Sequence, residues 1–125
     1  VHDSHPVITN CLFENNTTQS SGGAIVNNES SSATIVGSAF NKNEARNAHG
    51  GAIAQIGYAY DLYISDSSFS ENAAKRGGAI SFSGRHAEIT RSDFIGNLAQ
   101  YSGDAIYSDV NDRLTITECS FDSDS

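Results

Sequence analysis

One short block of sequence occurs five times and constrains the fold more than any other feature of the chain. In each copy an isoleucine is followed five residues later by a phenylalanine, and three residues after that by an asparagine or aspartate. The copies occupy residues 8–16, 35–43, 64–72, 89–97 and 116–124. Successive phenylalanines are 27, 29, 25 and 27 residues apart. A period of this length is typical of a solenoid, in which each repeat adds one coil.

A second block, Gly-Gly-Ala-Ile, lies between the copies of the first. It occurs at 22–25, 50–53 and 77–80, and as Gly-Asp-Ala-Ile at 103–106. The glycine pair permits a sharp or left-handed turn, so we expect a corner where each block begins. Parity leaves open whether the alanine or the isoleucine faces the core, and we expect the larger residue to do so.

The apolar residues around the isoleucines alternate as they do in a β-strand. Leu62 and Ile64 are two residues apart, as are Leu114 and Ile116. The isoleucine and phenylalanine of one block have opposite parity, so the alternation must break once between them, at a turn. The break falls at these residues: Asn10, Gly37, Asp66, Arg91 and Glu118. The residue after each break then points inward: Cys11, Ser38, Ser67, Ser92 and Cys119.

These patterns predict an all-β fold, a right-handed parallel β-helix of about five coils of about 27 residues. We place the coils near 7–33, 34–61, 62–86 and 87–113, with 114–125 partial, in a single domain that spans 1–125. Like residues stack on like about 4.8 Å apart in such a solenoid. The expected apolar ladders are Ile8, Ile35, Ile64, Ile89 and Ile116, and Phe13, Phe40, Phe69, Phe94 and Phe121. The expected amide ladder is Asn16, Asn43, Asn72 and Asn97, ending at Asp124.

The two interleaved blocks resemble the repeats of chlamydial polymorphic outer membrane proteins, which pair GGAI with FxxN. FENN, FNKN, FSEN and FIGN match one half of that pattern, and GGAI at 22, 50 and 77 matches the other. Asp104 and the final FDSD depart from it. The resemblance covers essentially the whole chain and implies a surface or secreted adhesion-type stalk. It transfers no binding site, because the matched residues are scaffold residues.

The charge of the chain limits its partners. The formal net charge is −8, and the seven basic residues are scattered along the sequence. Nucleic acids and anionic membrane surfaces need clustered Lys and Arg, so neither is expected to bind. No apolar run reaches membrane-spanning length, and we expect no membrane insertion. A secreted or cell-surface location is expected, with partners that are further copies of the chain, a host or cell-surface protein, or a glycan.

Some β-helices are pectate lyases or polygalacturonases, so catalysis needs to be considered. Those reactions require carboxylates that project together from adjacent coils. Glu88 is the one ionisable residue beside the isoleucines, and Asp93 and Asp122 beside the phenylalanines fall in different columns. We therefore expect no catalytic residues and no cofactor. The leading hypothesis is a non-enzymatic extracellular structural or adhesion module, and the alternative is a carbohydrate-active or glycan-binding β-helix.

The sequence contains candidate residues for two kinds of metal site. Calcium binds carboxylate and carbonyl oxygens, and the candidate residues are Asp109, Asp112, Asp122 and Asp124. Their spacing does not match a known calcium loop, so solubility is the simpler role. His2 and His5 have a loose metal-ligand spacing, but histidines so near a chain end are usually just exposed.

Cys11 and Cys119 occupy the same ladder position in the first and fifth coils. Four rises of about 4.8 Å separate them by roughly 19 Å, far beyond the Cα limit of about 7 Å for a disulfide. Either each replaces a buried serine, or Cys119 of one molecule meets Cys11 of the next in an end-to-end stack. Neither end carries an evident cap, so we expect a piece of a longer solenoid or a subunit that stacks into a fibre.

Three asparagines begin Asn-x-Ser/Thr sequons: Asn15, Asn16 and Asn28. Asn28 lies in the polar segment NNESSS and is expected to be the most accessible. Asn16 belongs to the amide ladder and is expected to be unavailable for glycosylation.

Overall fold

The structure is a computed structural model that describes residues 7–27, 32–102, 105–108 and 113–122. The described residues form sixteen β-strands and no helix. The strands make three parallel sheets, which we call A, B and C. Sheet A contains β1 (Val7–Thr9), β4 (Ile25–Asn27), β5 (Ala33–Val36), β8 (Ile53–Ser65), β11 (Ile80–Thr90), β14 (Ile106–Ser108) and β15 (Arg113–Thr117). Sheet B contains β2 (Leu12–Glu14), β6 (Ala39–Asn41), β9 (Ser68–Ser70), β12 (Asp93–Ile95) and β16 (Ser120–Asp122). Sheet C contains β3 (Thr17–Thr18), β7 (Glu44–His49), β10 (Ala73–Arg76) and β13 (Leu98–Ser102).

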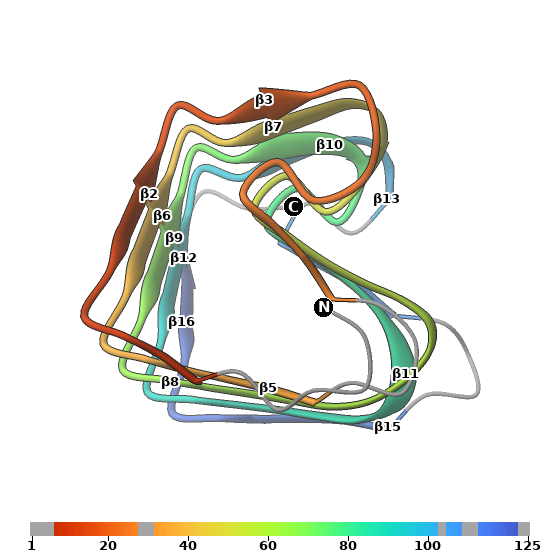
Figure 1. The fold of residues 1–125 in the computed structure, drawn as a ribbon. Helices are drawn as coiled ribbons and strands as arrows, with labels where there is room; N and C mark the ends of the chain where they lie inside the picture. The colour runs from red at the N-terminus through yellow and green to blue at the C-terminus, as the bar shows by residue number, and fades with distance from the viewer. Residues whose placement is uncertain (1–6, 28–31, 103–104, 109–112, 123–125) are drawn as a thin grey trace.

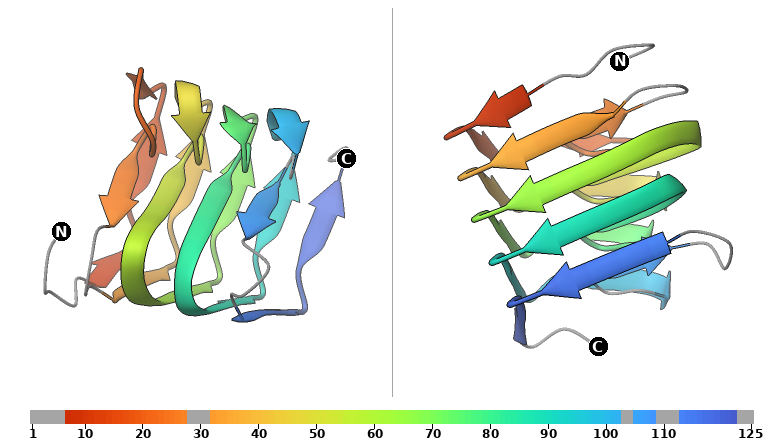
Figure 2. Two further views of the ribbon diagram at one scale, coloured as in Figure 1. Left: turned by 90° about the vertical axis from the view of Figure 1, so that its right-hand side faces the viewer. Right: turned by 90° about the horizontal axis from the view of Figure 1, so that it is seen from below.

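The chain winds as a right-handed solenoid. Figure 1 looks along its axis, and the chain runs clockwise as it passes from the near red coil to the far blue coil. Each coil passes through a strand of sheet A, then sheet B, then sheet C, and returns to sheet A. Four such circuits are followed by β15 and β16 of a fifth, and Figure 2 shows the coils side by side. The predicted right-handed parallel β-helix is confirmed.

The register between coils stacks like residues on like. The isoleucine ladder is continuous through all five rungs: Ile8, Ile35, Ile64, Ile89 and Ile116. The phenylalanine rings lie 4.8 to 4.9 Å apart between centroids, with planes within 8° of parallel. The inner rungs are completely buried, whereas Ile116 is 40% exposed and Phe121 44% exposed on the last described rung. Both ladders therefore form the apolar core, and their first and last described rungs are only partly buried.

The three corners of each coil use left-handed backbone in different ways. The first corner contains Asn10, Gly37, Asp66, Arg91 and Glu118, with φ between 46° and 61°. The second contains Asn15, Lys42, Glu71 and Gly96, with φ between 53° and 64°. At the third corner Gly22, Gly50 and Gly77 have φ of 66° to 71°, and a Cβ on Gly50 would lie 2.1 Å from the carbonyl oxygen of Ile53. Non-glycine residues accept a left-handed φ at a modest energetic penalty where space exists, but this backbone contact leaves no space.

After the third corner the chain turns inward rather than following the perimeter (Figure 1). Ala52 and Ile53 are both fully buried, which answers the question that parity left open. Their two N–H groups donate to the same acceptor, the carbonyl oxygen of Ala79 in the next coil, at 2.9 Å each. Consecutive residues can both be buried because this segment has protein on both sides.

Polar ladders hold the first two corners together. Asn72 Oδ1 accepts hydrogen bonds from the Asn43 backbone N–H at 2.9 Å and from Asn43 Nδ2 at 3.1 Å. Asn72 Nδ2 donates to the Phe40 carbonyl at 2.9 Å and to Asn97 Oδ1 at 3.0 Å. Buried polar groups are tolerated when they are paired in this way.

At the first corner a ladder of three serines pairs with backbone groups in the same way: Ser38, Ser67 and Ser92. The Ser67 hydroxyl donates to the Ser65 carbonyl at 2.9 Å and accepts the Ser38 backbone N–H at 3.2 Å. Cys11 and Cys119 occupy this position at the two ends, and both are free thiols. Cys11 Sγ lies 3.2 Å from the Thr9 carbonyl, so the thiol takes the place of the serine hydroxyl.

Candidate functional site

The ladders occupy the interior, so the side chains available for binding lie on the outer faces of the three sheets. The strands of sheet C carry Arg46, Lys75 and Arg76 against Glu44 alone, a net charge of +2. The strands of sheet B carry Glu14, Asp93 and Asp122 and no basic residue, a net charge of −3. Sheet C is therefore locally positive in a chain whose net charge is −8.

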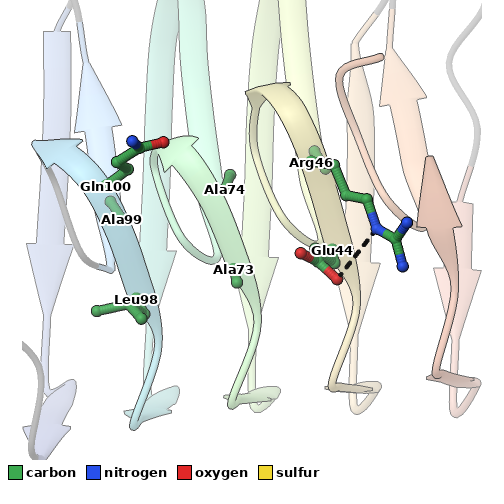
Figure 3. Close-up of a pocket in the computed structure, with 8 residues that line it drawn as sticks. Glu44, Arg46, Ala73, Ala74, Leu98, Ala99 and Gln100 are labelled. Carbon is green, nitrogen blue, oxygen red and sulfur yellow. Dashed lines mark ion pairs between the residues drawn. The ribbon is translucent and has the colours of Figure 1, made fainter. Parts of the chain in front are cut away.

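A groove of about 450 Å³ runs over β10 on this face. Figure 3 shows Ala73 and Ala74 in the groove between longer side chains, with Glu44 and Arg46 of β7 on one side and Leu98 and Gln100 of β13 on the other. The groove exists because a short side chain separates two longer ones: Ala73 is in register with Glu44 on one neighbouring strand and Leu98 on the other. Its volume falls in the range of small-ligand sites.

Cations and aromatic rings gather at the end of β10. Lys75 Nζ lies 5.9 Å from the centre of the Tyr101 ring. Arg76 Cζ lies 5.8 Å from the same ring and 5.5 Å from that of Tyr107. These separations are those of cation–π contacts, which hold the cations without neutralising them. The His49 ring meets that of Tyr107 edge-on at 6.0 Å.

The positive charge of this face is only weakly compensated. Among the described residues neither Lys75 nor Arg76 forms a salt bridge. Arg46 Nε lies 3.7 Å from Glu44 Oε1, and both side chains are about half exposed. Exposed pairs of this kind contribute little energy and open readily. Within the described part of the chain, Lys75 and Arg76 thus contact aromatic rings and no acidic group, and Arg46 has one weak acidic partner.

This cluster corrects the expectation that the basic residues are scattered. Arg46, Lys75 and Gln100 each lie three residues after an asparagine of the amide ladder, so the solenoid places them on successive rungs of one face. The shared offset from Asn43, Asn72 and Asn97 is the signal by which the sequence could have shown it. Residues that are 29 and 25 apart in the chain become neighbours because one coil separates them.

The acidic residues weighed as weak candidates do not form a cluster in the described part of the chain. Asp93 is in register with Ser120, whose hydroxyl is 2.6 Å from its Oδ1, and not with Asp122. No group of three or more His, Cys, Asp or Glu positioned to hold a metal occurs among the described residues. Three calcium candidates, Asp109, Asp112 and Asp124, lie outside those residues, as do His2 and His5, and the side chain of Asp122 is not described.

The sequon asparagines are placed in part. Asn28 lies outside the described residues. Asn15 is exposed at the second corner with φ of 59°. Asn16 is also exposed, which corrects the expectation that the ladder makes it inaccessible. Its Nδ2 donates to Asn43 Oδ1 at 2.9 Å, but in the described structure only one side of its amide faces another rung.

The family of the Chlamydia polymorphic membrane protein repeat matches residues 10–28 and 66–83. These two segments of the chain are therefore similar to that repeat. Each matched segment begins at a first corner, passes through sheets B and C and includes a Gly-Gly-Ala-Ile block. No curated protein and no solved structure matches the chain. Within the part of the chain that the structure describes, no helix has the length and apolarity to cross a membrane.

Proposed function

We propose that this chain is a non-enzymatic adhesion module of a cell-surface or secreted protein, and that sheet C is its binding face. The polymorphic membrane protein repeats support a surface location. The ladder side chains contact one another in the interior, so the side chains that can contact a partner are those on the outer faces. This arrangement supports adhesion through an outer face. The observation that carries the proposal is the reversal of charge on sheet C, where Arg46 lines a groove and two further cations lie at the end of β10.

An adhesion assay tests this proposal. Beads coated with the purified chain are applied to cultured epithelial cells and counted after washing. The variant Lys75→Gln/Arg76→Gln removes two charges from sheet C, and Lys42→Gln/Arg91→Gln removes two charges from the corners. We expect the first variant to abolish most attachment and the second to retain it. Equal attachment of both variants would refute sheet C as the adhesive face.

The alternative is a carbohydrate-active β-helix, and one assay separates it from adhesion. The chain is incubated with polygalacturonate and the release of unsaturated or reducing uronate ends is followed. Turnover that survives purification to homogeneity would overturn the non-enzymatic proposal. Retention of the polymer without turnover supports it.

End-to-end association is a second proposal, favoured by the hydrogen-bond pattern of the coils. The N–H before each ladder phenylalanine donates to the coil before it, as from Ala39 to the Cys11 carbonyl and from Ser120 to the Ser92 carbonyl. Continuing that pattern pairs Leu12 N–H of one copy with the Cys119 carbonyl of another. The same register sets Phe13 on Phe121, which is 44% exposed. A second copy in this register adds its first described rung to the last described rung by strand pairing.

The two cysteines provide the test of this register. In the stack Cys119 of one copy and Cys11 of the next are adjacent rungs, about 4.8 Å apart and within disulfide reach. We expect mild oxidation to give a ladder of covalent multimers on a non-reducing gel. Cys11→Ser and Cys119→Ser should each abolish it. A single-cysteine variant that still forms a covalent dimer would show a different contact and refute the register.

A further inference from the structure

We infer that the groove over β10 binds an anionic glycan, with Arg46, Lys75 and Arg76 contacting its acidic groups and Tyr101 contacting its sugar rings. The inference rests on the proposed adhesive function and names the ligand class for that face. Arg46 and Lys75 belong to neighbouring coils, whose strands lie about 4.8 Å apart. Lys75 and Arg76 are consecutive at the end of β10. Arg46 therefore lines the groove itself, and Lys75 and Arg76 lie next to Tyr101 at the end of the strand that forms the groove floor.

The charges favour a ligand that carries several anionic groups close together. The chain as a whole is anionic, so its long-range electrostatic field does not attract a ligand that carries one negative charge. Near the patch the local charge of +2 dominates, because salt screens charges beyond a Debye length of about 8 Å. Guanidinium groups make paired hydrogen bonds with carboxylates and comparable oxyanions. A polymer of uronate or sulfated sugar units supplies such groups at repeated intervals.

The groove also offers apolar surface, which sugars use and polyphosphates do not. The floor of the groove is Ala73 and Ala74, and its wall includes Leu98, which is 64% exposed. Tyr101, three residues after Leu98 on β13, is 62% exposed. Aromatic and aliphatic surface packs against the C–H faces of a sugar ring by the hydrophobic effect. Nucleic acids depend on many phosphate contacts, and three cations on an anionic protein supply few.

An acidic peptide is disfavoured by the pairing of the strands. Extended peptides commonly bind by adding a strand to a free sheet edge. β10 is paired on both sides, with β7 and β13, so the groove exposes no backbone edge for such an addition. A peptide would have to bind through side chains alone, whereas a glycan needs only side-chain contacts.

The test measures binding of the purified chain to heparin, polygalacturonate, dextran and polyglutamate by biolayer interferometry at several salt concentrations. We expect heparin or polygalacturonate to bind, and dextran and polyglutamate to bind at least tenfold more weakly. Binding by heparin alone would show that the site requires sulfate groups. Binding by both heparin and polygalacturonate would show that carboxylate groups are sufficient for recognition. Polyglutamate binding as tightly as either glycan would overturn the inference in favour of an acidic peptide.

Matched variants place the ligand in the groove. Lys75→Gln/Arg76→Gln and Lys42→Gln/Arg91→Gln both lower the net charge to the same value. Two lost charge-assisted hydrogen bonds predict at least tenfold weaker binding for the first double variant, and we expect less than a threefold change for the second. Equal weakening would show that total charge, not this groove, governs binding.

Two further variants separate specific recognition from simple attraction. Tyr101→Ser should weaken binding severalfold without changing its salt dependence, because it removes stacking surface and no charge. Glu44→Gln should strengthen binding, since Glu44 is the acid beside Arg46. Unchanged affinity in both would refute the assigned contacts. If no glycan binds while Lys75→Gln/Arg76→Gln still abolishes cell attachment, the adhesive function stands and the glycan inference fails.

Discussion

The amide ladder offers the sharpest test of how this solenoid is stabilised, through the substitution Asn72→Ala. Asn72 is completely buried, and its side chain takes part in four hydrogen bonds to three residues. The substitution removes the acceptor of the Asn43 backbone N–H and the donor to the Phe40 carbonyl. A buried polar group that loses its partner costs about 1–3 kcal/mol, so two such groups predict a loss of about 2–6 kcal/mol. Domains of this kind have total stabilities of about 5–15 kcal/mol.

Asn16→Ala is the matched control, because it is the same residue type in the same ladder at an exposed rung. Asn16 Nδ2 donates a hydrogen bond to Asn43 Oδ1, and that oxygen keeps a second partner in the Asn16 backbone N–H at 3.1 Å. We expect this control to lose less than about 1 kcal/mol. Guanidinium unfolding followed by far-ultraviolet circular dichroism gives both free energies. Equal losses would refute the claim that the buried rungs of the ladder carry the stability of the corner.

Two further predictions concern the corners. Gly51→Ala should prevent folding, because the added Cβ would lie 2.0 Å from the Gly78 carbonyl oxygen. Gly96→Ala should lower the stability by only about 1–2 kcal/mol, since the nearest atom to its added Cβ is 3.7 Å away. Soluble yield and thermal unfolding distinguish the two variants, and a stable Gly51→Ala chain would contradict the packing argument. The hydrogen bond from Arg91 lowers the pKa of Asp66 below its usual value, so the stability lost in Arg91→Ala should be greatest near neutral pH and should shrink as the pH falls through the lowered pKa. Urea unfolding at pH 7 and pH 3 measures that difference, and a larger loss at pH 3 would contradict the sign.

The amino-acid sequence by itself determined the coil and its interior. In a solenoid each rung contacts only its neighbours, so residues one period apart become contacts and the spacing of the repeat maps directly onto space. The parity argument therefore located the first corner at Asp66 and its equivalents, and the structure shows that their backbone there is left-handed. It also placed Ser67 inward, where its hydroxyl serves the neighbouring coil.

The tertiary structure decided how the outer faces are composed. The chain turns inward after the third corner and buries Ala52 with Ile53, a path set by packing between sheets and not by strand alternation. In β10 the register shifts between Ala74 and Arg76, and this irregularity is not visible in the period. It aligns Arg76 with residues that simple counting would not pair with it.

The composition of the proposed binding face also depends on the tertiary structure. Arg46 and Lys75 are 29 residues apart in the chain, and no local sequence motif links them. They form one surface only because neighbouring rungs align. The groove over β10 requires the actual side-chain lengths on three adjacent strands, with Ala73 in the middle. The residues that point inward can be predicted from the repeat period, because each rung packs on the same residue type in the neighbouring coil. Outward positions are free to differ between coils, so their arrangement is decided by register and by the side chains that each rung carries.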